Sequence, residues 1–368
     1  MSGKRKFIKW SLIVLAVLVV SIVLFGVWFI SLIPPVPESA GGIKATVPAN
    51  LPYLTENIVP YRGKILAVVT STGQMGSSGK STGYELTELS RAYYVFQANG
   101  FEVDVASPLG GAPPVVIDGE DMNAYDYAFL NDTTAQAKVR QTIAMKDVDP
   151  NAYQAVYFVG GKGTMYDFPD NEYIQSLVRE YYESGKVVGA VCHGPAALVN
   201  VRLSNGELLL ANRQVSCFTN EEELLLIPEA AEVFPFLLQD KLIERGARFN
   251  EGFLYLNKVS KDGNLITGQN PWSTWMVAES VIERMGYVPK QRVITQEENT
   301  ISILETLEAE GYQQAKVVID RFCTRDVASI DRRLLAMHGL VAGMQFDGVK
   351  VVQLARLLSY SNGYLPKQ

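Results

Sequence analysis

The sequence of 368 residues contains only two histidines, His193 and His338, and only three cysteines, Cys192, Cys217 and Cys323. Two histidines exclude sites built from several histidines, and they restrict any cysteine–histidine chemistry to one of these two. Three cysteines are too few for a disulfide framework. The formal charge of −6 gives no basic surface, so we expect no nucleic-acid partner. Hydrophobic residues make up 48% of the chain, which is ample for a folded core.

A long uncharged stretch lies near the N-terminal end. Residues 1–9 carry four basic residues and no acid, and residues 10–33 carry no charge. At 1.5 Å per residue these 24 residues span about 36 Å, enough for a bilayer core of about 30 Å. We expect a single-pass cell-membrane anchor through residues 10–33. Its N-terminus is expected in the cytoplasm and the catalytic domain outside it, in the periplasm of a Gram-negative cell. A cleaved signal peptide is the alternative.

Short apolar strands alternate with helices in the middle of the chain. Strands are predicted at 64–71, 101–108, 155–161, 186–192, 215–218 and 265–267, and helices at 82–99, 171–184, 234–245 and 271–285. This alternation predicts an α/β fold with a parallel sheet covered on both faces. Residues 109–150 interrupt the pattern, and we interpret them as an insertion with one short helix at 134–145.

The last part of the chain has a different pattern. Four helical stretches are predicted at 297–310, 312–322, 330–342 and 348–360. They form a small all-α extension of two helical hairpins, weakly similar to tetratricopeptide repeats. The predicted division has four parts: a cytoplasmic stub and transmembrane helix (1–33), a linker (34–62), an α/β domain (63–287) and the extension (288–368). Whether the extension binds a protein partner stays open.

The run AVCHGPAAL at 190–198 is the strongest chemical signal. A strand leads into Cys192, and His193, Gly194 and a helix follow at once. A nucleophile at such a turn stands exposed at the carboxyl edge of the sheet. A helix N-terminus there lowers the thiol pKa and offers N–H donors to an oxyanion. A buried structural cysteine is the alternative interpretation.

Two further features could complete a site around Cys192. Gly160, Gly161 and Lys162 follow a predicted strand, so their backbone N–H groups could face the same edge; a plain tight turn is equally consistent. Glu88 lies on the helix that follows the first strand, where a helical glutamate is ordinarily a surface residue. His338 lies on an apolar helix face and is interpreted as structural, as are Cys217 and Cys323.

The chain resembles the PfpI-type branch of the class I glutamine amidotransferase-like superfamily, the group with cofactor-independent glyoxalase III and holding-chaperone proteins. The resemblance covers about Lys64 to Gly286. It is carried by TGYELTELSRAYYVF (82–96), VASPLGG (105–111), AFLND (128–132), DVDPNAYQAVYFVGGKG (147–163), AVCHGPAAL (190–198), FTNEEE (218–223), FPFLLQDKLIERGA (234–247) and LITGQNP (265–271). It implies a flavodoxin-like three-layer sandwich.

The resemblance also assigns roles to single residues. Cys192 matches the family nucleophile, His193 its adjacent histidine, and Glu88 the buried acid beside the cysteine. Glu223 matches the acid that orients the histidine, with Glu222 as the second choice. The oxyanion and substrate-binding positions are matched by Gly160, Gly161, Lys162, Gly194 and the N–H of His193. Many relatives have histidine where this chain has Lys162, so this lysine either binds substrate or marks a loss of activity.

The implied function is a glyoxalase III-type lyase that acts on a small carbonyl substrate, a 2-oxoaldehyde such as methylglyoxal, giving D-lactate, or a related deglycase. No cofactor and no metal are expected, and a homodimer is expected from the relatives. A cysteine–histidine amide or peptide hydrolase and a non-catalytic membrane-tethered stress or binding protein are the alternatives. The downstream histidine of true glutamine amidotransferases is missing, because no histidine lies between His193 and His338.

Overall fold

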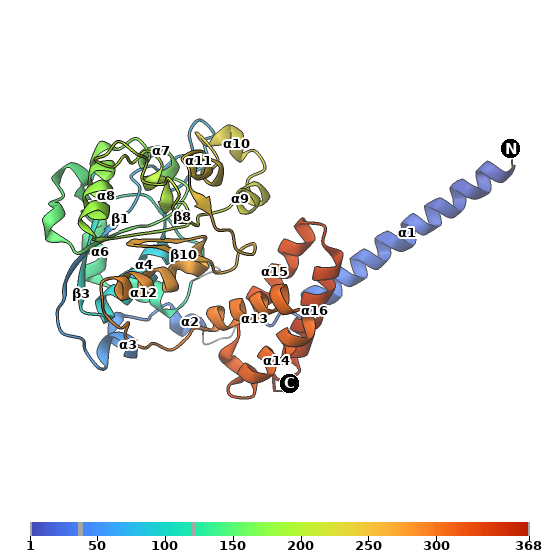
Figure 1. Ribbon diagram of the computed structural model, residues 1–368. Helices are drawn as coiled ribbons and strands as arrows, with labels where there is room; N and C mark the ends of the chain where they lie inside the picture. The colour runs from blue at the N-terminus through green and yellow to red at the C-terminus, as the bar shows by residue number, and fades with distance from the viewer. Residues whose placement is uncertain (1, 36–39, 120–121, 367–368) are drawn as a thin grey trace. The chain divides into compact units, whose positions relative to one another are not determined.

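The computed structural model describes residues 2–35, 40–119 and 122–366 (Figure 1). These form two compact units. One comprises the described residues between 38 and 293, and the other combines those up to 37 with those from 294 onward. The N-terminal helix and the C-terminal helices therefore belong to one unit. The four-part division drawn from the sequence stays a prediction, and residues 36–39 of its linker lie outside the described residues.

A seven-stranded sheet forms the centre of the larger unit. Its strands are β1 (Gly63–Val68), β3 (Phe101–Ser107), β5 (Ile143–Ala144), β6 (Ala155–Phe158), β7 (Val187–Val191), β10 (Val259–Asp262) and β11 (Leu265–Gly268). The spatial order is β10-β11-β7-β6-β1-β3-β5, and only the β10–β11 pair is antiparallel. The predicted α/β class with a mostly parallel sheet is thereby confirmed.

Successive residues of each strand point to opposite faces of this sheet, and each face has its own core. Ile65 and Ala67 of β1 contribute to one core, together with α4 (Leu86–Ala98) and α12 (Thr274–Arg284). Leu66 and Val68 contribute to the other, together with α8 (Glu172–Ser184) and α11 (Leu238–Glu244). Two layers of helices thus enclose the sheet.

Several smaller elements complete this unit. They are α2 (Ala40–Ile43), α3 (Pro52–Thr55), α5 (Ala124–Asn131), α6 (Thr133–Arg140), α7 (Thr164–Asp167), α9 (Asn220–Leu226), α10 (Ala230–Val233), β2 (Tyr84–Glu85) paired with β4 (Val115–Val116), β8 (Gln214–Val215) paired with β9 (Arg248–Phe249), and short 3₁₀ turns.

Four local predictions were wrong. The strand expected at 215–218 is only β8, which pairs with β9 outside the main sheet. The helix expected at 234–245 is interrupted, because Pro235 removes a helical donor between α10 and α11. The insertion contains two helices, α5 and α6, rather than one, because Asp132 caps a new helix start. Antiparallel β10, at the sheet edge, was not predicted at all.

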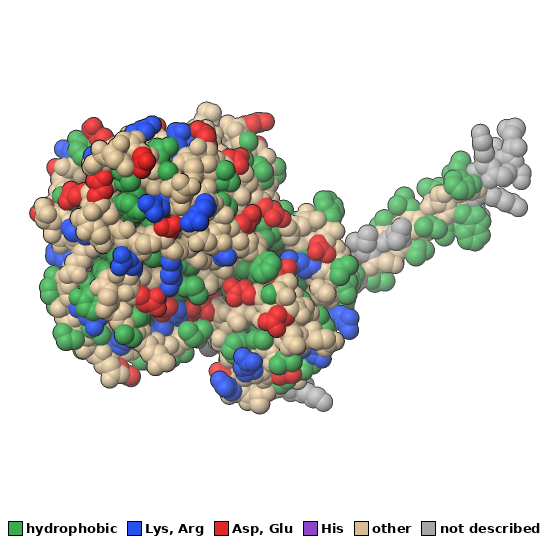
Figure 2. Space-filling model, viewed as in Figure 1, with side chains coloured by type: hydrophobic (Ala, Val, Ile, Leu, Met, Phe, Trp, Pro, Cys, Tyr) green, Lys and Arg blue, Asp and Glu red, His purple; other side chains and the backbone are tan. Residues whose placement is uncertain are grey.

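The second unit is helical. It contains α1 (Ser2–Ser31), α13 (Gln296–Glu310), α14 (Tyr312–Cys323), α15 (Arg332–Met344) and α16 (Gly348–Asn362), so the predicted C-terminal helical region is confirmed. Its core includes Leu304, Ile319, Leu335 and Leu358, each at most 2% exposed. Within α1, the segment Trp10–Ser31 has the length and composition to cross a membrane, with a mean hydropathy of 3.1. Figure 2 shows the apolar side chains along this helix.

Candidate active site

Cys192 stands at the turn immediately after β7. Its φ of 58° lies in the left-handed region, which a non-glycine residue adopts at a cost of about 1–3 kcal/mol. The backbone holds it there from both sides: its N–H donates to the Gly268 carbonyl and its carbonyl accepts the Phe218 N–H, both at 3.0 Å. The strained turn lifts the sulfur above the carboxyl edge of the sheet. The following helix is only a five-residue 3₁₀ turn, Gly194–Leu198, rather than the α-helix that the sequence suggested.

Two glycines make room for this turn. A Cβ at Gly160 would lie 2.5 Å from the Glu88 carboxyl and 2.8 Å from Cys192 Cβ. A Cβ at Gly194 would lie 2.3 Å from the carbonyl oxygen of Phe158. All three distances are shorter than real Cβ contacts. These glycines therefore allow the chain to pass close to the sulfur, which is a packing role beside the substrate-binding role expected for them.

His193 connects Cys192 to Glu223. Its Nδ1 lies 3.3 Å from the Cys192 sulfur, and its Nε2 lies 2.5 Å from Glu223 Oε2. All three side chains are buried, with exposed fractions of 3%, 1% and 5% for Cys192, His193 and Glu223. An ionised carboxylate only accepts hydrogen bonds, so Nε2 carries a proton, and Nδ1 is the ring nitrogen that can accept the proton of the thiol. This is the geometry of a nucleophile, a base and an orienting acid.

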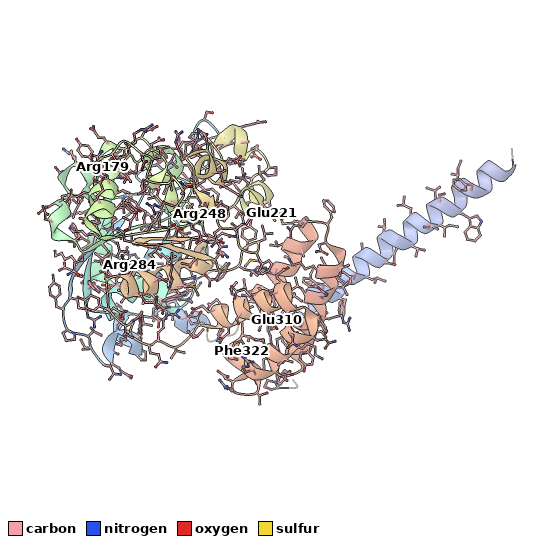
Figure 3. The ribbon with its side chains drawn as sticks, in the orientation of Figure 1. Arg179, Glu221, Arg248, Arg284, Glu310 and Phe322 are labelled. Carbon is pink, nitrogen blue, oxygen red and sulfur yellow. The ribbon has the colours of Figure 1, made fainter. Side chains whose placement is uncertain are left out.

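The run of three glutamates at the start of α9 divides into three roles. Glu221, labelled in Figure 3, is exposed, whereas Glu222 and Glu223 are buried. Glu222 accepts hydrogen bonds from the side chains of Gln269 and Asn270 and from the Thr219 and Tyr255 N–H groups. Glu223, the first choice of the sequence analysis, is therefore the one that contacts His193, and Glu222 fixes the helix that carries it.

Glu88 lies on the opposite side of the sulfur. It is 0% exposed, its Oε2 accepts the Gly160 N–H at 2.7 Å, and its carboxyl is within hydrogen-bonding reach of the Cys192 thiol. Its Oε1 has no other partner in the part of the chain that the structure describes. Glu88 is thus a buried acid at the sulfur and not a surface residue of α4.

Burial favours the neutral forms of the Glu88 carboxyl and the Cys192 thiol. It raises the pKa of Glu88, and the charge of Glu85 raises it further. Burial also raises the pKa of the Cys192 thiol, with the Glu88 and Glu85 charges adding to the rise. The lowered thiol pKa expected from a helix N-terminus was therefore wrong, because the sulfur is enclosed and the helix is short. A neutral Glu88 carboxyl can donate a hydrogen bond to the sulfur once His193 removes the thiol proton.

The pKa of Glu223, the carboxyl that contacts His193, shifts in the opposite direction to that of Glu88. Burial works to raise the pKa of Glu223, but the attraction of His193 when that ring is protonated, the hydrogen bond between the two and the charge of Lys162 outweigh it. The pKa of Glu223 is therefore lower than that of an ordinary glutamate. A carboxylate that stays ionised keeps the imidazole proton on Nε2, and so keeps Nδ1 available to the thiol.

Lys162 is the cation of the site. It is partly buried, and its charge lowers the pKa of Cys192, Glu88 and Glu223 alike. No carboxylate within the described ranges pairs with its ammonium group. The N–H groups of Gly161 and His193, the expected oxyanion donors, likewise have no protein acceptor among those residues. A negatively charged oxygen above the sulfur would meet these donors and this cation.

Sequence reasoning missed several contributors. The Phe218 ring packs against His193 with centroids 4.8 Å apart, and the Thr164 hydroxyl donates to the His193 carbonyl at 3.0 Å. Gln269 and Asn270, both fully buried, hold Glu222. The LITGQNP run that contains them was noticed as a family feature. Its polar residues directly after an apolar strand were a signal that they face the site.

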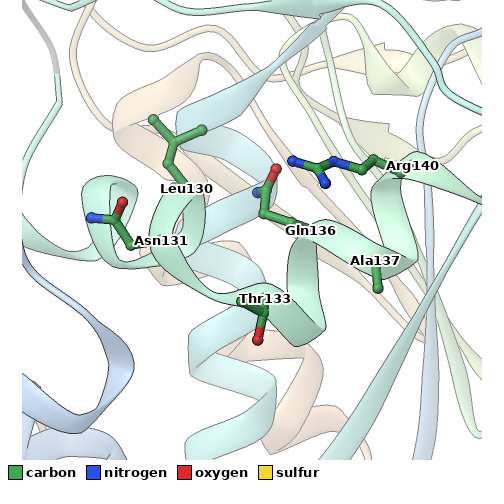
Figure 4. A pocket seen from close by; sticks show the side chains of 6 residues that line it. All are labelled: Leu130, Asn131, Thr133, Gln136, Ala137 and Arg140. Carbon is green, nitrogen blue, oxygen red and sulfur yellow. The ribbon is translucent and has the colours of Figure 1, made fainter.

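A pocket of about 180 Å³ lies at helices α5 and α6 (Figure 4). Its lining consists of Leu130, Asn131, Thr133, Gln136, Ala137 and Arg140. None of these residues belongs to the Cys192 site, and none is a nucleophile or a carboxylate. The chemistry of the larger unit is therefore assigned to the enclosed Cys192 site and not to this pocket.

Known proteins resemble the larger unit in sequence and in structure. Glyoxalase 3 of Candida albicans is 30% identical over 236 residues, which cover 60% of this chain and 97% of the relative. Glutathione-independent glyoxalase hsp3102 of Schizosaccharomyces pombe is 28% identical over 236 residues, covering 61% of this chain and 98% of that protein. The X-ray structure of the Rapid Encystment Protein of 24 kDa from Francisella tularensis superimposes with a TM-score of 0.58 and 35% identity. It covers 61% of this chain and 99% of that one.

The match to a protein family covers the same part of the chain. The DJ-1/PfpI family matches residues 80–284, a range that begins just before α4 and ends with α12. It contains Glu88, Gly160, Cys192, His193 and Glu223, the residues that the fold brings together at one edge of the sheet. By this match over more than half of its length, the chain belongs to the DJ-1/PfpI family.

Proposed function

We propose that the larger unit is a glutathione-independent glyoxalase, which converts 2-oxoaldehydes such as methylglyoxal to 2-hydroxy acids. The observation that carries the proposal is the contact sequence from Cys192 through His193 to Glu223, with Glu88 on the other side of the sulfur. The two curated relatives described above, which align over nearly their whole length, are named as glyoxalases.

The chemistry begins at the aldehyde carbon. Cys192 Sγ attacks this carbon while the thiol proton passes to His193 Nδ1 and then to the carbonyl oxygen, which gives a hemithioacetal. A proton leaves the former aldehyde carbon and one is added to the neighbouring carbon. This oxidises the first carbon and reduces the second, and the product is a thioester. Water then cleaves the thioester, so one water is consumed for each 2-hydroxy acid released.

The surrounding residues support these steps. The intermediate between the two proton transfers carries negative charge on oxygen, where the Gly161 and His193 N–H groups and Lys162 offer stabilisation. Glu88, kept neutral by burial, can donate to the sulfur whenever it is a thiolate. Glu223 holds the His193 ring in position for each proton transfer.

The test is lactate formation from methylglyoxal by the full chain without added glutathione. We expect turnover by the unmodified protein, and its loss in Cys192→Ala. Cys217→Ala is the matched control, because Cys217 is also buried in this unit but does not touch His193. Absence of lactate from a folded, unmodified protein, or equal rates for Cys192→Ala and Cys217→Ala, contradicts the proposal. Peptide hydrolysis blocked by Cys192→Ala would instead support the hydrolase alternative.

We further propose that α1 is a retained membrane anchor and not a cleaved signal peptide. Its last turn is part of the folded helical unit: Phe29 is only 5% exposed, and the Asn362 amide donates to the Leu32 carbonyl at 2.6 Å. Cleavage after the apolar segment would remove Phe29 from its site beside Gly339.

The proposed topology places residues 1–9 in the cytoplasm and the α/β unit outside it. We expect the chain to stay in the membrane pellet after extraction with alkaline carbonate. In intact spheroplasts, a protease added outside should degrade the α/β unit. A shortened, carbonate-soluble chain would contradict the anchor, and protection of the α/β unit would contradict the topology.

A further inference from the structure

The hairpin of α15 and α16 leaves a group of apolar side chains uncovered at its turn. Leu340 and Met344 of α15 are 58% and 51% exposed, and Phe346 in the turn is 96% exposed. Val349 and Val352 of α16 are 71% and 45% exposed. We call these five residues the hairpin tip. An apolar group of this size on a soluble surface ordinarily marks a site for protein or membrane.

The other end of the same hairpin has a different surface. Arg333, Arg356, Ser359 and Gly363 are its exposed residues. In the tip, Lys350 is partly buried against Glu308, and the exposed Asp347 accepts the Lys350 N–H at 2.9 Å as a helix cap. Apolar side chains therefore predominate at the turn and polar ones at the base.

Two contacts fix the direction of the hairpin relative to α1 within this unit. At the base, the Asn362 side chain donates to the Leu32 carbonyl. Further along, Phe29 lies against Gly339, where a Cβ would come within 2.7 Å of the Phe29 ring. Going from Leu32 to Phe29 enters the apolar segment Trp10–Ser31. The partners of these two residues on the hairpin are Asn362 at its base and Gly339 nearer its tip. The hairpin therefore runs from base to tip in the direction in which α1 enters its apolar segment.

The remaining length of α15 places the tip beyond this contact. From Gly339, Met344 is five residues further along α15, which is about 7.5 Å at 1.5 Å per residue, and Phe346 follows in the turn. Phe29 itself lies two residues from the outer end of the apolar segment. The tip therefore lies further than the Phe29 contact in the direction in which α1 enters its apolar segment.

We propose that the hairpin tip is a second membrane contact: Leu340, Met344, Phe346, Val349 and Val352 lie in the interfacial layer of the bilayer that α1 spans. A lipid surface is the occupant favoured over a protein because the hairpin runs from its base to its tip in the direction in which α1 enters its apolar segment. Apolar side chains bordered by a polar face are typical of segments that lie in this layer. The proposal rests on the anchor proposed above and is independent of the glyoxalase activity.

The test places a fluorophore at the tip of the full chain in phosphatidylcholine vesicles. Phe346→Cys is labelled with an environment-sensitive dye in a chain that also carries Cys192→Ala, which removes the reactive thiol of the active site, and Cys217 and Cys323, at 0% and 3% exposed, are protected by burial. Ser359→Cys, exposed at the base of the same hairpin, is the matched control, and Leu12→Cys reports on α1. We expect blue-shifted emission and quenching by headgroup-level nitroxide lipids at 346, water-like emission at 359, and quenching by deep acyl-chain nitroxides at 12.

Four other results overturn the proposal. Quenching at 12 with water-like emission at 346 leaves the anchor and removes the tip contact. Emission at 346 that is shielded from iodide but insensitive to nitroxide lipids means that protein covers the tip. Absence of quenching at 12 removes the anchor and the tip contact together. A label at Val349→Cys should become water-like when Phe346→Asp is added, and it contradicts the proposal if it does not. None of these readouts involves Cys192, so failure of the glyoxalase proposal leaves them unchanged.

Discussion

Each unit of the molecule buries one of the two histidines, and the two surroundings differ. His193 is 1% exposed, and each of its ring nitrogens has a partner. Nδ1 faces the Cys192 sulfur, and Nε2 donates to the Glu223 carboxylate. His338 is 7% exposed among the apolar side chains of the helical unit, where burial and then the charge of Lys350 lower its pKa to about 4. Burial among apolar side chains therefore favours the neutral form of His338, whereas His193 has the two partners that the proton transfer proposed above requires.

The largest expected effect tests whether this difference is functional. His193→Gln removes the acceptor for the thiol proton, and we expect a loss of about 10³-fold or more in kcat/KM for methylglyoxal. His338→Gln is the control and should keep the rate of the unmodified protein. Similar losses in both variants, with both folded by circular dichroism, would mean that His193 has no special role.

The second effect concerns the stability of the helical unit in acid. The pKa of His338 is depressed from about 6.5 to about 4 in the folded state. The contribution of the buried neutral ring to the free energy of unfolding is therefore fully present above pH 6.5 and is lost as the pH falls toward 4. At 1.36 kcal/mol per pKa unit, the loss reaches about 3 kcal/mol. Hydrogen exchange of α15 amides should accelerate between pH 6.5 and 4, after correction for intrinsic exchange, more than that of α4 amides. His338→Leu should abolish the difference; acceleration that persists in this variant assigns it to another group.

The third effect separates the orienting acid from the neighbouring glutamates. Glu223→Gln keeps the shape of the side chain but removes the charge that holds the His193 proton on Nε2. We expect kcat/KM to fall about 10- to 100-fold, with kcat carrying most of the change. Glu221→Gln, exposed on the same turn of α9, should have no effect. A fall in Glu221→Gln of the same size would indicate a general charge effect of α9.

The smallest effect concerns Lys162. Its charge lowers the pKa of the Cys192 thiol, so Lys162→Met should raise the pH at which iodoacetamide alkylates Cys192. We expect kcat/KM to fall about three- to tenfold, because a partly exposed charge is screened by water. Lys146→Met, exposed elsewhere in the same unit, is the control. An unchanged alkylation profile in Lys162→Met would show that the lysine does not act on the sulfur.

Much of this site could be predicted from short runs of residues. The strand before Cys192 and the Cys–His–Gly–Pro run after it predicted a turn that exposes the sulfur at the carboxyl edge of the sheet; the structure has the turn, but Cys192 is only 3% exposed, so the predicted exposure was wrong. The resemblance identified Glu88 and Glu223, and the fold brings both to the sulfur and His193. The thiol pKa could not be predicted, because it depends on how completely β7, α4 and the 160–163 loop enclose the sulfur. The position of Glu222 between Gln269 and Asn270 likewise depends on segments almost 50 residues apart.

By itself the sequence determined the α/β class, the apolar N-terminal helix, the four C-terminal helices and the histidine available to Cys192. Each of these depends on residue type and short-range periodicity, which a single segment contains. Only the tertiary structure decided which of three consecutive glutamates meets His193, that Phe29 of α1 lies against Gly339 of α15, and that the α15–α16 turn leaves its apolar residues uncovered. These depend on contacts between segments distant in the chain, where the free energy comes from burial and from the pairing of polar groups that no local pattern records.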